Sequence, residues 1–371
     1  MPTSPEVIIV GGGVIGCSIA FHLAKTGVKA LVLERDRWGA GASYAASGGL
    51  GVTDEPHPYD RMERESLNLF HDLAEELYEL CGVDVELVKS GELDLALTED
   101  AVRRLQGGVS RSIELGGTAC WLDTREVHEM EPDITPMALG ALYRPENCRI
   151  NNQRVTEAFV RAATRFGAEF RQGTEVVGLT HKAQKVTGVS LHGEKLAADR
   201  VVIAAGAWTG LVGRSAGIDA PLRPVRGQNL NLQPTTSGIR TIIHGSDGVL
   251  VPRNDGSVMA GVTVEEAAFD DRVTTGGIRS IMNMVTAAVP ALDDATLNWA
   301  VSGLRPGSPD EMPLLGTVSG MDRLILASGH YTSGILLCPI TGLLIANLIT
   351  GGDTELLDAF SPDRFRDSCE K

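Results

Sequence analysis

A glycine-rich turn between an apolar stretch and a helical pattern constrains this chain more than any other feature. Gly11, Gly13 and Gly16 form a GxGxxG pattern that follows the Val/Ile-rich stretch 6–10 and precedes a helical pattern over 17–25. In such a unit one glycine permits the tight turn, the second lets the backbone approach a pyrophosphate, and the third allows close helix packing. The pattern predicts an anion at the helix N-terminus.

An acidic residue ends the next apolar segment, which covers residues 28–34. Glu34 lies 18 residues after Gly16, the position from which a carboxylate accepts hydrogen bonds from a ribose diol. Strand, helix and second strand together occupy about 30 residues, the usual length of a βαβ unit. The sequence therefore predicts a dinucleotide site, for FAD or for NAD.

Segment 39–51, rich in glycine, alanine and serine, favours FAD. Its small side chains and hydroxyls can wrap closely around a diphosphate and a flavin ring, and a nicotinamide domain does not require such a segment after its second strand. An NAD-dependent dehydrogenase would explain the glycines and Glu34 but not this segment. We expect contacts to FAD from Ala42, Ser43, Ser47, Gly48, Gly49 and Leu50.

Charge and cysteine usage exclude several classes of protein. The formal net charge of −15 disfavours nucleic acids and anionic membranes as partners. The apolar stretch 7–10 is too short for a signal-peptide core, and no stretch reaches about 18 uninterrupted apolar residues, so we expect a cytoplasmic protein. The six cysteines are scattered singly, which indicates neither a disulfide framework nor a metal site.

The remaining chain alternates between helical and strand-like patterns. Helical spacing predicts helices over 60–80, 155–166, 278–289 and 341–349, with a short charged helix within 123–132. Apolar or alternating runs predict strands over 92–97, 201–206, 229–232, 248–251, 257–262 and 324–327, and a hairpin over 176–191. A length of 371 residues favours about two domains.

Motifs spread over nearly the whole chain resemble the D-amino-acid oxidase superfamily, and within it the glycine oxidase branch associated with thiamine biosynthesis. Besides the two N-terminal motifs they are WLD and EP within 121–132, VIAAGAW at 202–208, RGQ at 226–228, LVPR at 250–253, GVTVE with FD within 261–270, GLRPGSPD at 303–310, and GHY with GILL within 329–337.

The resemblance implies an α/β chain (α+β overall), in which a Rossmann-like FAD-binding domain is interleaved with a mainly antiparallel β substrate domain. The FAD-binding domain is expected to comprise 1–84, 150–222 and 303–371, and the substrate domain 85–149 and 223–302. The active site is expected where the two domains meet.

The resemblance also implies roles for individual residues. Arg305 is expected to clamp the substrate carboxylate, because a guanidinium makes two parallel charge-assisted hydrogen bonds to such a group. His330 is a weaker candidate for exchanging protons with the substrate, since a lone histidine next to glycine is more often a packing residue. The further contacts to FAD are expected from Val14, Ile15, Arg35, Val176, Ala205, Gly206, Trp208, Arg305, His330, Tyr331, Thr332, Ser333, Gly334 and Ile335.

Three comparisons with the family pattern refine these expectations. Related sarcosine oxidases attach flavin through a cysteine near the position of Arg305, and no cysteine stands there, so FAD is expected to be non-covalent. Thr332 and Ser333 stand where the family often has Arg-Asn, and Val249 stands where some members have a tyrosine facing the substrate. The pocket is therefore expected to be less polar, which leaves larger or N-alkylated amino acids open beside glycine.

The implied activity is oxidation of a small amino acid, such as glycine, sarcosine or a related amine, to an imino acid and then an oxo acid, with O2 reduced to H2O2. One alternative is an FAD-dependent D-amino-acid or N-alkyl amino-acid dehydrogenase that passes electrons to a quinone or carrier. A second is a non-catalytic flavin-binding protein, which would not need Arg305. The resemblance also suggests a homo-oligomer, for which a tetramer is one form.

Overall fold

A largely parallel sheet grows out of the glycine-rich βαβ unit. In the computed structural model, which describes residues 5–54, 58–235, 238–245 and 248–368, β1 (Val7–Val10) lies between β2 (Ala30–Leu33) and β12 (Arg200–Ile203), parallel to both. All residues of β1 and β2 are buried, as expected for strands covered on both faces. The sheet is completed by β8 (Glu169–Arg171), β9 (Val176–Lys182), β10 (Lys185–Leu191), β11 (Lys195–Ala197), β18 (Leu314–Val318) and β19 (Met321–Ser328).

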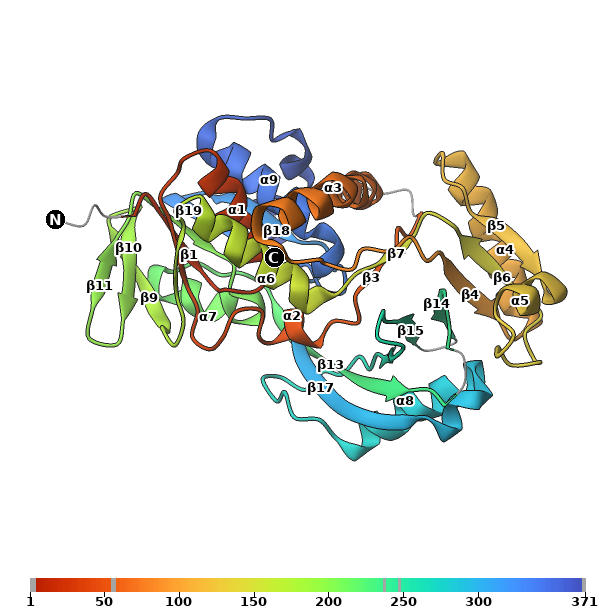
Figure 1. The fold of residues 1–371 in the computed structure, drawn as a ribbon. Helices are drawn as coiled ribbons and strands as arrows, with labels where there is room; N and C mark the ends of the chain where they lie inside the picture. Colours follow the sequence, from red (N-terminus) through yellow and green to blue (C-terminus); the bar gives the residue numbers. More distant parts are fainter. Residues whose placement is uncertain (1–4, 55–57, 236–237, 246–247, 369–371) are drawn as a thin grey trace.

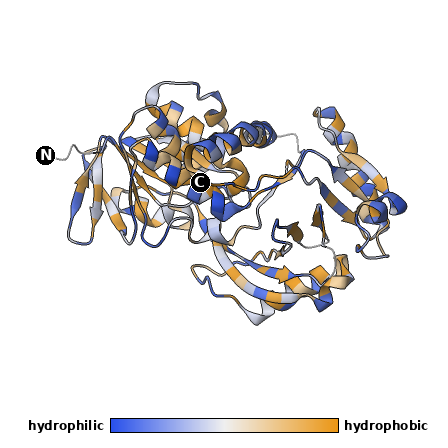
Figure 2. Cartoon of the chain, in the orientation of Figure 1, coloured by the Kyte–Doolittle hydropathy of each residue, from blue (hydrophilic) through white to orange (hydrophobic). Residues whose placement is uncertain are grey.

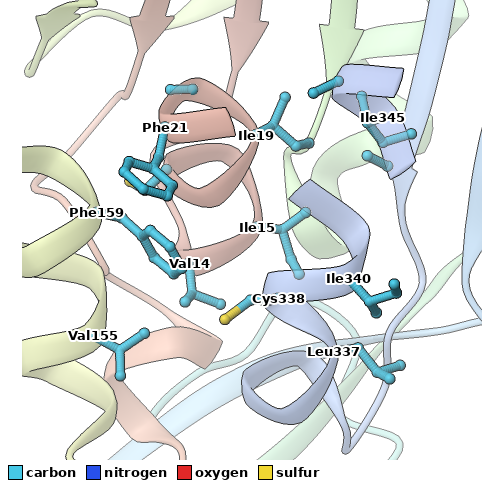
Figure 3. Close-up of a cluster of buried hydrophobic side chains, with 14 of the residues drawn as sticks. Val14, Ile15, Ile19, Phe21, Val155, Phe159, Leu337, Cys338, Ile340 and Ile345 are labelled. Atoms are coloured by element: carbon cyan, nitrogen blue, oxygen red, sulfur yellow. The ribbon is translucent and has the colours of Figure 1, made fainter. Parts of the chain in front are cut away.

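Helices pack against this first sheet and form the larger core (Figure 1). They are α1 (Val14–Lys25), α3 (Pro58–Cys81), α6 (Asn152–Arg165) and α9 (Gly334–Thr350). Figure 3 shows Phe21 of α1 beside Phe159 of α6, and Ile15 of α1 facing α9 near Cys338. Figure 2 shows hydrophilic residues along much of α3.

The second sheet is mainly antiparallel and bends away from the first (Figure 1). Its strands, in spatial order, are β17 (Thr296–Gly307), β13 (Arg223–Gln233), β16 (Val258–Gly261), β15 (Val249–Pro252), β14 (Ile242–His244), β4 (Glu92–Ala96), β6 (Gly140–Arg144) and β5 (Cys120–Asp123). Only the pairing of β14 with β4 is parallel among those that the described residues form. The covering helices are α4 (Glu99–Glu114), α5 (Thr124–Met130) and α8 (Thr275–Ala288).

Short elements connect the two sheets. They are α2 (Ala42–Ala45), α7 (Thr209–Gly213), and the small pair β3 (Gly49–Leu50) and β7 (Cys148–Arg149). The glycine-rich segment 39–51 is thus partly helical and partly paired. The helix α4 was not expected from the sequence, and α9 begins seven residues before the start of the predicted helix at 341.

The interleaving of two sheets confirms the expected fold class. The first sheet takes its strands from 7–33, 169–203 and 314–328, and the second from 92–144 and 223–307. Strand β17 runs through the domain boundary predicted at 302/303, and the precise domain limits stay a prediction.

Among the helices of the described residues, no single one is long and apolar enough to cross a bilayer. Helix α9 and segment 355–365 reach that length and composition only together, and they are bent by 107° at the break between them. Most of α9 is buried in the core described above.

Candidate active site

The glycine-rich turn has the close contacts that its residue types require. A Cβ on Gly11 would lie 2.4 Å from the Ala204 carbonyl oxygen, and one on Gly16 would lie 2.0 Å from the Gly11 oxygen. Around Gly13, in contrast, a Cβ would meet only Ser43 Oγ, at 3.2 Å. Gly13 is the N-cap of α1 and supplies no side-chain cap, so the positive end of this helix is accessible to an anion.

Glu34 directly follows β2 and lies against the glycine-rich turn. Its Oε2 accepts a hydrogen bond from the Gly12 amide at 2.7 Å, and its Oε1 accepts one from the Asp36 amide at 2.8 Å. Each carboxylate oxygen keeps a lone pair that can accept a further bond from a ribose hydroxyl. Next to it, the Arg35 guanidinium stacks 3.8 Å from the Trp208 ring centroid.

A cavity of about 720 Å³ lies between the two sheets, a size typical of sites that enclose a whole ligand. The predicted residues that line it are Val14, Ile15, Ala42, Ser43, Ser47, Gly48, Gly49, Arg305, His330, Tyr331, Thr332, Ser333, Gly334 and Ile335. The structure therefore brings the start of α1, the segment 42–49 and the C-terminal turn to one cavity.

The other predicted residues lie outside the lining of this cavity. They are Gly11, Gly13, Gly16, Glu34, Arg35, Leu50, Val176, Ala205, Gly206 and Trp208. Leu50 is fully buried in the core beside the segment that lines the cavity. A separate pocket of about 540 Å³ is lined by Arg35 and by residues 173–175, directly before Val176, and adenosine contacts in this region stay a prediction.

Arg305 is a partly buried cation without an anionic partner among the described residues. It extends from β17 over Gly227 of β13, where a Cβ would lie only 2.0 Å from its Nη2. Its Nη1 donates to the Thr263 carbonyl oxygen at 3.1 Å, while Nε and Nη2 donate to none of the described residues. Burial lowers the pKa of Arg305, yet a guanidinium remains charged at neutral pH. An anion in the cavity would complete its hydrogen bonds.

His330 lines the same cavity, and its ring contacts helix α9. Its Nε2 lies 3.0 Å from the Thr341 hydroxyl oxygen on α9, and the residue is 3% exposed. Burial lowers the pKa of His330 to about 3, so the imidazole is neutral at physiological pH. These contacts fit a structural role, and proton exchange with a substrate stays a prediction.

Two residues that sequence reasoning did not single out hold the segment 43–48 in place. Asn152 donates from Nδ2 to the carbonyl oxygens of Ser43 and Tyr44, at 2.7 and 3.1 Å. Arg253 donates from Nη2 to Asn152 Oδ1 and from Nη1 to the Ile150 oxygen, both at 2.8 Å. Arg253 is the last residue of the LVPR motif, and the family resemblance of that motif could have pointed to it.

A charged wall, formed by Glu92, Asp94, Arg144 and His244, closes another part of the cavity. Arg144 Nη1 lies 2.6 Å from Asp94 Oδ2 and 3.5 Å from Glu92 Oε1, and His244 Nε2 lies 3.5 Å from the same Glu92 oxygen. Burial opposes protonation of His244, but Glu92 outweighs it and raises the pKa of His244 to about 9. Sequence reasoning missed this wall.

Apolar side chains separate the charged wall from Arg305. Val249, Val262 and Val264 line the cavity, and Val249 is the residue expected to make the pocket less polar. That expectation describes only part of the lining, because Glu92, Asp94 and Arg144 come from strands β4 and β6, far from position 249 in the sequence, and only His244, which pairs with Val249, lies near it.

Comparisons with known proteins place the chain among flavoenzymes. Residues 6–348 match the family model DAO, described as FAD dependent oxidoreductase. Glycine oxidase from Bacillus licheniformis is 32% identical over 97% of each chain, and that from Geobacillus kaustophilus is 34% identical over 94% of each. The crystal structure of glycine oxidase from Geobacillus kaustophilus superposes with a TM-score of 0.94, covering 98% of this chain and 99% of that one.

Proposed function

Because the chain belongs to the DAO family of FAD-dependent oxidoreductases and is an amino-acid-oxidising flavoenzyme, we propose that its substrate is a small α-amino acid and its electron acceptor is dioxygen. Glycine, sarcosine and related amines are the first candidates, and the relatives of that name support this choice. The product would be an imino acid, which water hydrolyses to an oxo acid and an amine.

One observation carries the carboxylate part of this proposal, namely that the guanidinium of Arg305 in the cavity wall has no carboxylate partner among the described residues. A partly buried charge is costly unless an opposite charge and hydrogen bonds compensate it. Arg305 has one carbonyl partner and no carboxylate among the described residues, and its remaining donors suit the two oxygens of a substrate carboxylate. The substrate would then be fixed with its Cα at a constant position.

The residues that would hold FAD fit the shape of that group. Gly13 leaves the start of α1 open for a diphosphate, Glu34 keeps acceptor capacity for a ribose, and the turn 332–335 lines the cavity beside α1. When bound, FAD supplies a two-electron acceptor for the hydrogen on the substrate Cα.

The state of His330 indicates how the substrate would lose its protons. With a pKa of about 3 and a hydrogen bond to Thr341, this imidazole is a poor acceptor for the proton of an ammonium group. The amino group would therefore lose its proton to solvent before oxidation, and Arg305 alone would orient the neutral amine form. This role needs no side-chain base.

The test is a hydrogen peroxide assay on the purified holoenzyme with glycine, sarcosine, N-ethylglycine and both enantiomers of the common amino acids. Anaerobic bleaching of the flavin spectrum with each compound is recorded in parallel. Peroxide together with bleaching supports the oxidase. Bleaching without peroxide would point to a dehydrogenase, and absence of both signals with every amino acid would refute the proposed function.

A further inference from the structure

The charged wall is the strongest feature of the cavity that the proposed function leaves unused. Glu92 and Asp94 lie on β4, His244 on β14 and Arg144 on β6. Holding a carboxylate at Arg305 and orienting a small amine do not require any of these four residues. The charges of an ion-pair cluster that lines a ligand cavity nevertheless attract or repel the part of a ligand that approaches them.

The cluster behind the wall has an excess of negative charge. Arg144 is shared among Asp54, Glu92 and Asp94, and Arg64 is shared between Asp54 and Asp60. Four carboxylates therefore face two guanidinium groups and one imidazole. The net charge is negative whether or not His244 is protonated.

Asp94 is the carboxylate of this cluster that is most accessible from the cavity. Its side chain is 23% exposed, whereas those of Glu92 and Asp54 are 9% and 7% exposed. Its Oδ2 accepts from Arg144, and its Oδ1 accepts no hydrogen bond from the described residues. A free carboxylate oxygen on a negatively charged wall suits a hydrogen-bond donor that carries positive charge.

The wall and Arg305 lie on strands that are well separated in the order of the second sheet. The Arg305 guanidinium lies over β13, and the order β13, β16, β15, β14, β4 places β4 four strands away. At a spacing of about 4.8 Å this is roughly 19 Å along the sheet. Because Arg305 and Asp94 line one cavity and the sheet bends (Figure 1), the straight path between them is shorter than this distance along the sheet.

We propose that Asp94, supported by Glu92, forms a subsite for an ammonium group at the far end of the substrate. The substrate class would then be α-amino acids with a basic side chain. This inference rests on the proposed function, because it assumes that Arg305 holds the α-carboxylate. The valines between the two ends, Val249 and Val262, would contact the methylene groups of such a side chain.

A divalent cation is a weaker fit to the same residues. Glu92, Asp94 and His244 each offer one ligand atom, and these atoms lie within 4.8 Å of one another. However, Arg144 already lies between the two carboxylates, 2.6 Å from Asp94 Oδ2 and 3.5 Å from Glu92 Oε1. A metal ion needs several ligand atoms at once from residues that Arg144 already engages, whereas an ammonium group needs only the unoccupied Asp94 Oδ1.

The test compares amino acids of increasing side-chain length on the holoenzyme. The basic series runs from 2,3-diaminopropionate through 2,4-diaminobutyrate and ornithine to lysine, as both enantiomers, and the neutral series comprises 2-aminobutyrate, norvaline and norleucine. Homoserine and glutamate complete the set. Anaerobic flavin reduction gives kcat/KM for each, and the basic compound of best length should exceed its neutral counterpart about tenfold or more.

The variant Asp94→Asn separates a subsite from a structural role. It should lower kcat/KM for the preferred basic substrate about ten- to a hundredfold and leave norvaline unchanged. Asp199→Asn, which removes an exposed ion pair with Arg323 outside the cavity, is the matched control. Thermal unfolding and the flavin spectrum verify that both variants fold and retain FAD.

Three results would overturn the inference. The first is a wild-type preference for neutral, hydroxylated or acidic side chains, which requires no variant at all. The second is an equal effect of Asp94→Asn on basic and neutral substrates. In both cases flavin reduction by other amino acids would leave the proposed function standing. The third result is that no amino acid reduces the flavin. The proposed function then fails, and this inference fails with it.

Discussion

Truncation of Arg305 to alanine should weaken transition-state binding of any substrate that carries a carboxylate. Arg305 is partly buried, and Nη1 alone has a partner among the described residues, the Thr263 oxygen. Removing one member of a buried, hydrogen-bonded charge pair costs about 3–5 kcal/mol. That corresponds to a loss of roughly a hundred- to a few-thousandfold in kcat/KM.

The decisive assay compares glycine with glycinamide on the wild type and on Arg305→Ala. The wild type should prefer glycine by about two orders of magnitude, because the amide lacks the charge that Arg305 binds. The variant should lose most of this preference while keeping its flavin absorbance. Arg305→Lys should fall between the two, since lysine keeps the charge but not the planar fork.

A control variant, Arg323→Ala, removes an exposed arginine that pairs with Asp199 outside the cavity. It should leave kcat/KM for glycine and kcat/KM for glycinamide unchanged. The reasoning is refuted if Arg305→Ala retains full flavin and oxidises glycine with an unchanged kcat/KM, or if it loses activity equally towards glycine and glycinamide.

Three further predictions follow from the geometry. Gly13→Val should prevent FAD binding by filling the space at the start of α1, and a purified variant with a full flavin spectrum would contradict it. Arg253→Met should weaken FAD binding about tenfold or more, because it removes the two hydrogen bonds from Arg253 to Ile150 and Asn152. Asn152 in turn holds segment 43–48, and FAD titration of the apoprotein measures the change. His244 has a raised pKa of about 9 beside Glu92, so its stabilising effect is complete below about pH 6.5 and is lost as the pH rises through 9. The melting temperature of His244→Gln should therefore lie below that of the wild type at pH 6 and approach it at pH 10; a constant difference would contradict this assignment.

Local patterns were sufficient for the dinucleotide unit. Close contacts in the turn force Gly11 and Gly16 to be glycine, and the alternation of apolar strand and helix around them is readable over a few dozen residues. The carboxylate Glu34 follows at a fixed distance for the same reason, since one helix of ordinary length returns the chain to the neighbouring strand. These elements could be predicted because their residues are close in the sequence.

The role of Arg305 is a different case. No periodicity around it distinguishes this arginine from the other arginines of the chain, and only the family resemblance of the GLRPGSPD motif singled it out. The structure adds the physical reason, which is the missing side chain at Gly227 on the neighbouring strand that makes room for the guanidinium.

The sequence by itself determined the dinucleotide unit, and its resemblance to a known family added the two interleaved domains and the C-terminal turn that lines the cavity. Only the tertiary structure decided what else lines that cavity. Asp94 meets Arg144 across 50 residues, and Arg253 reaches Asn152 across 101. Such contacts arise when strands from separate parts of the chain pair in one sheet, and strand pairing depends on the packing of the whole molecule rather than on any local pattern.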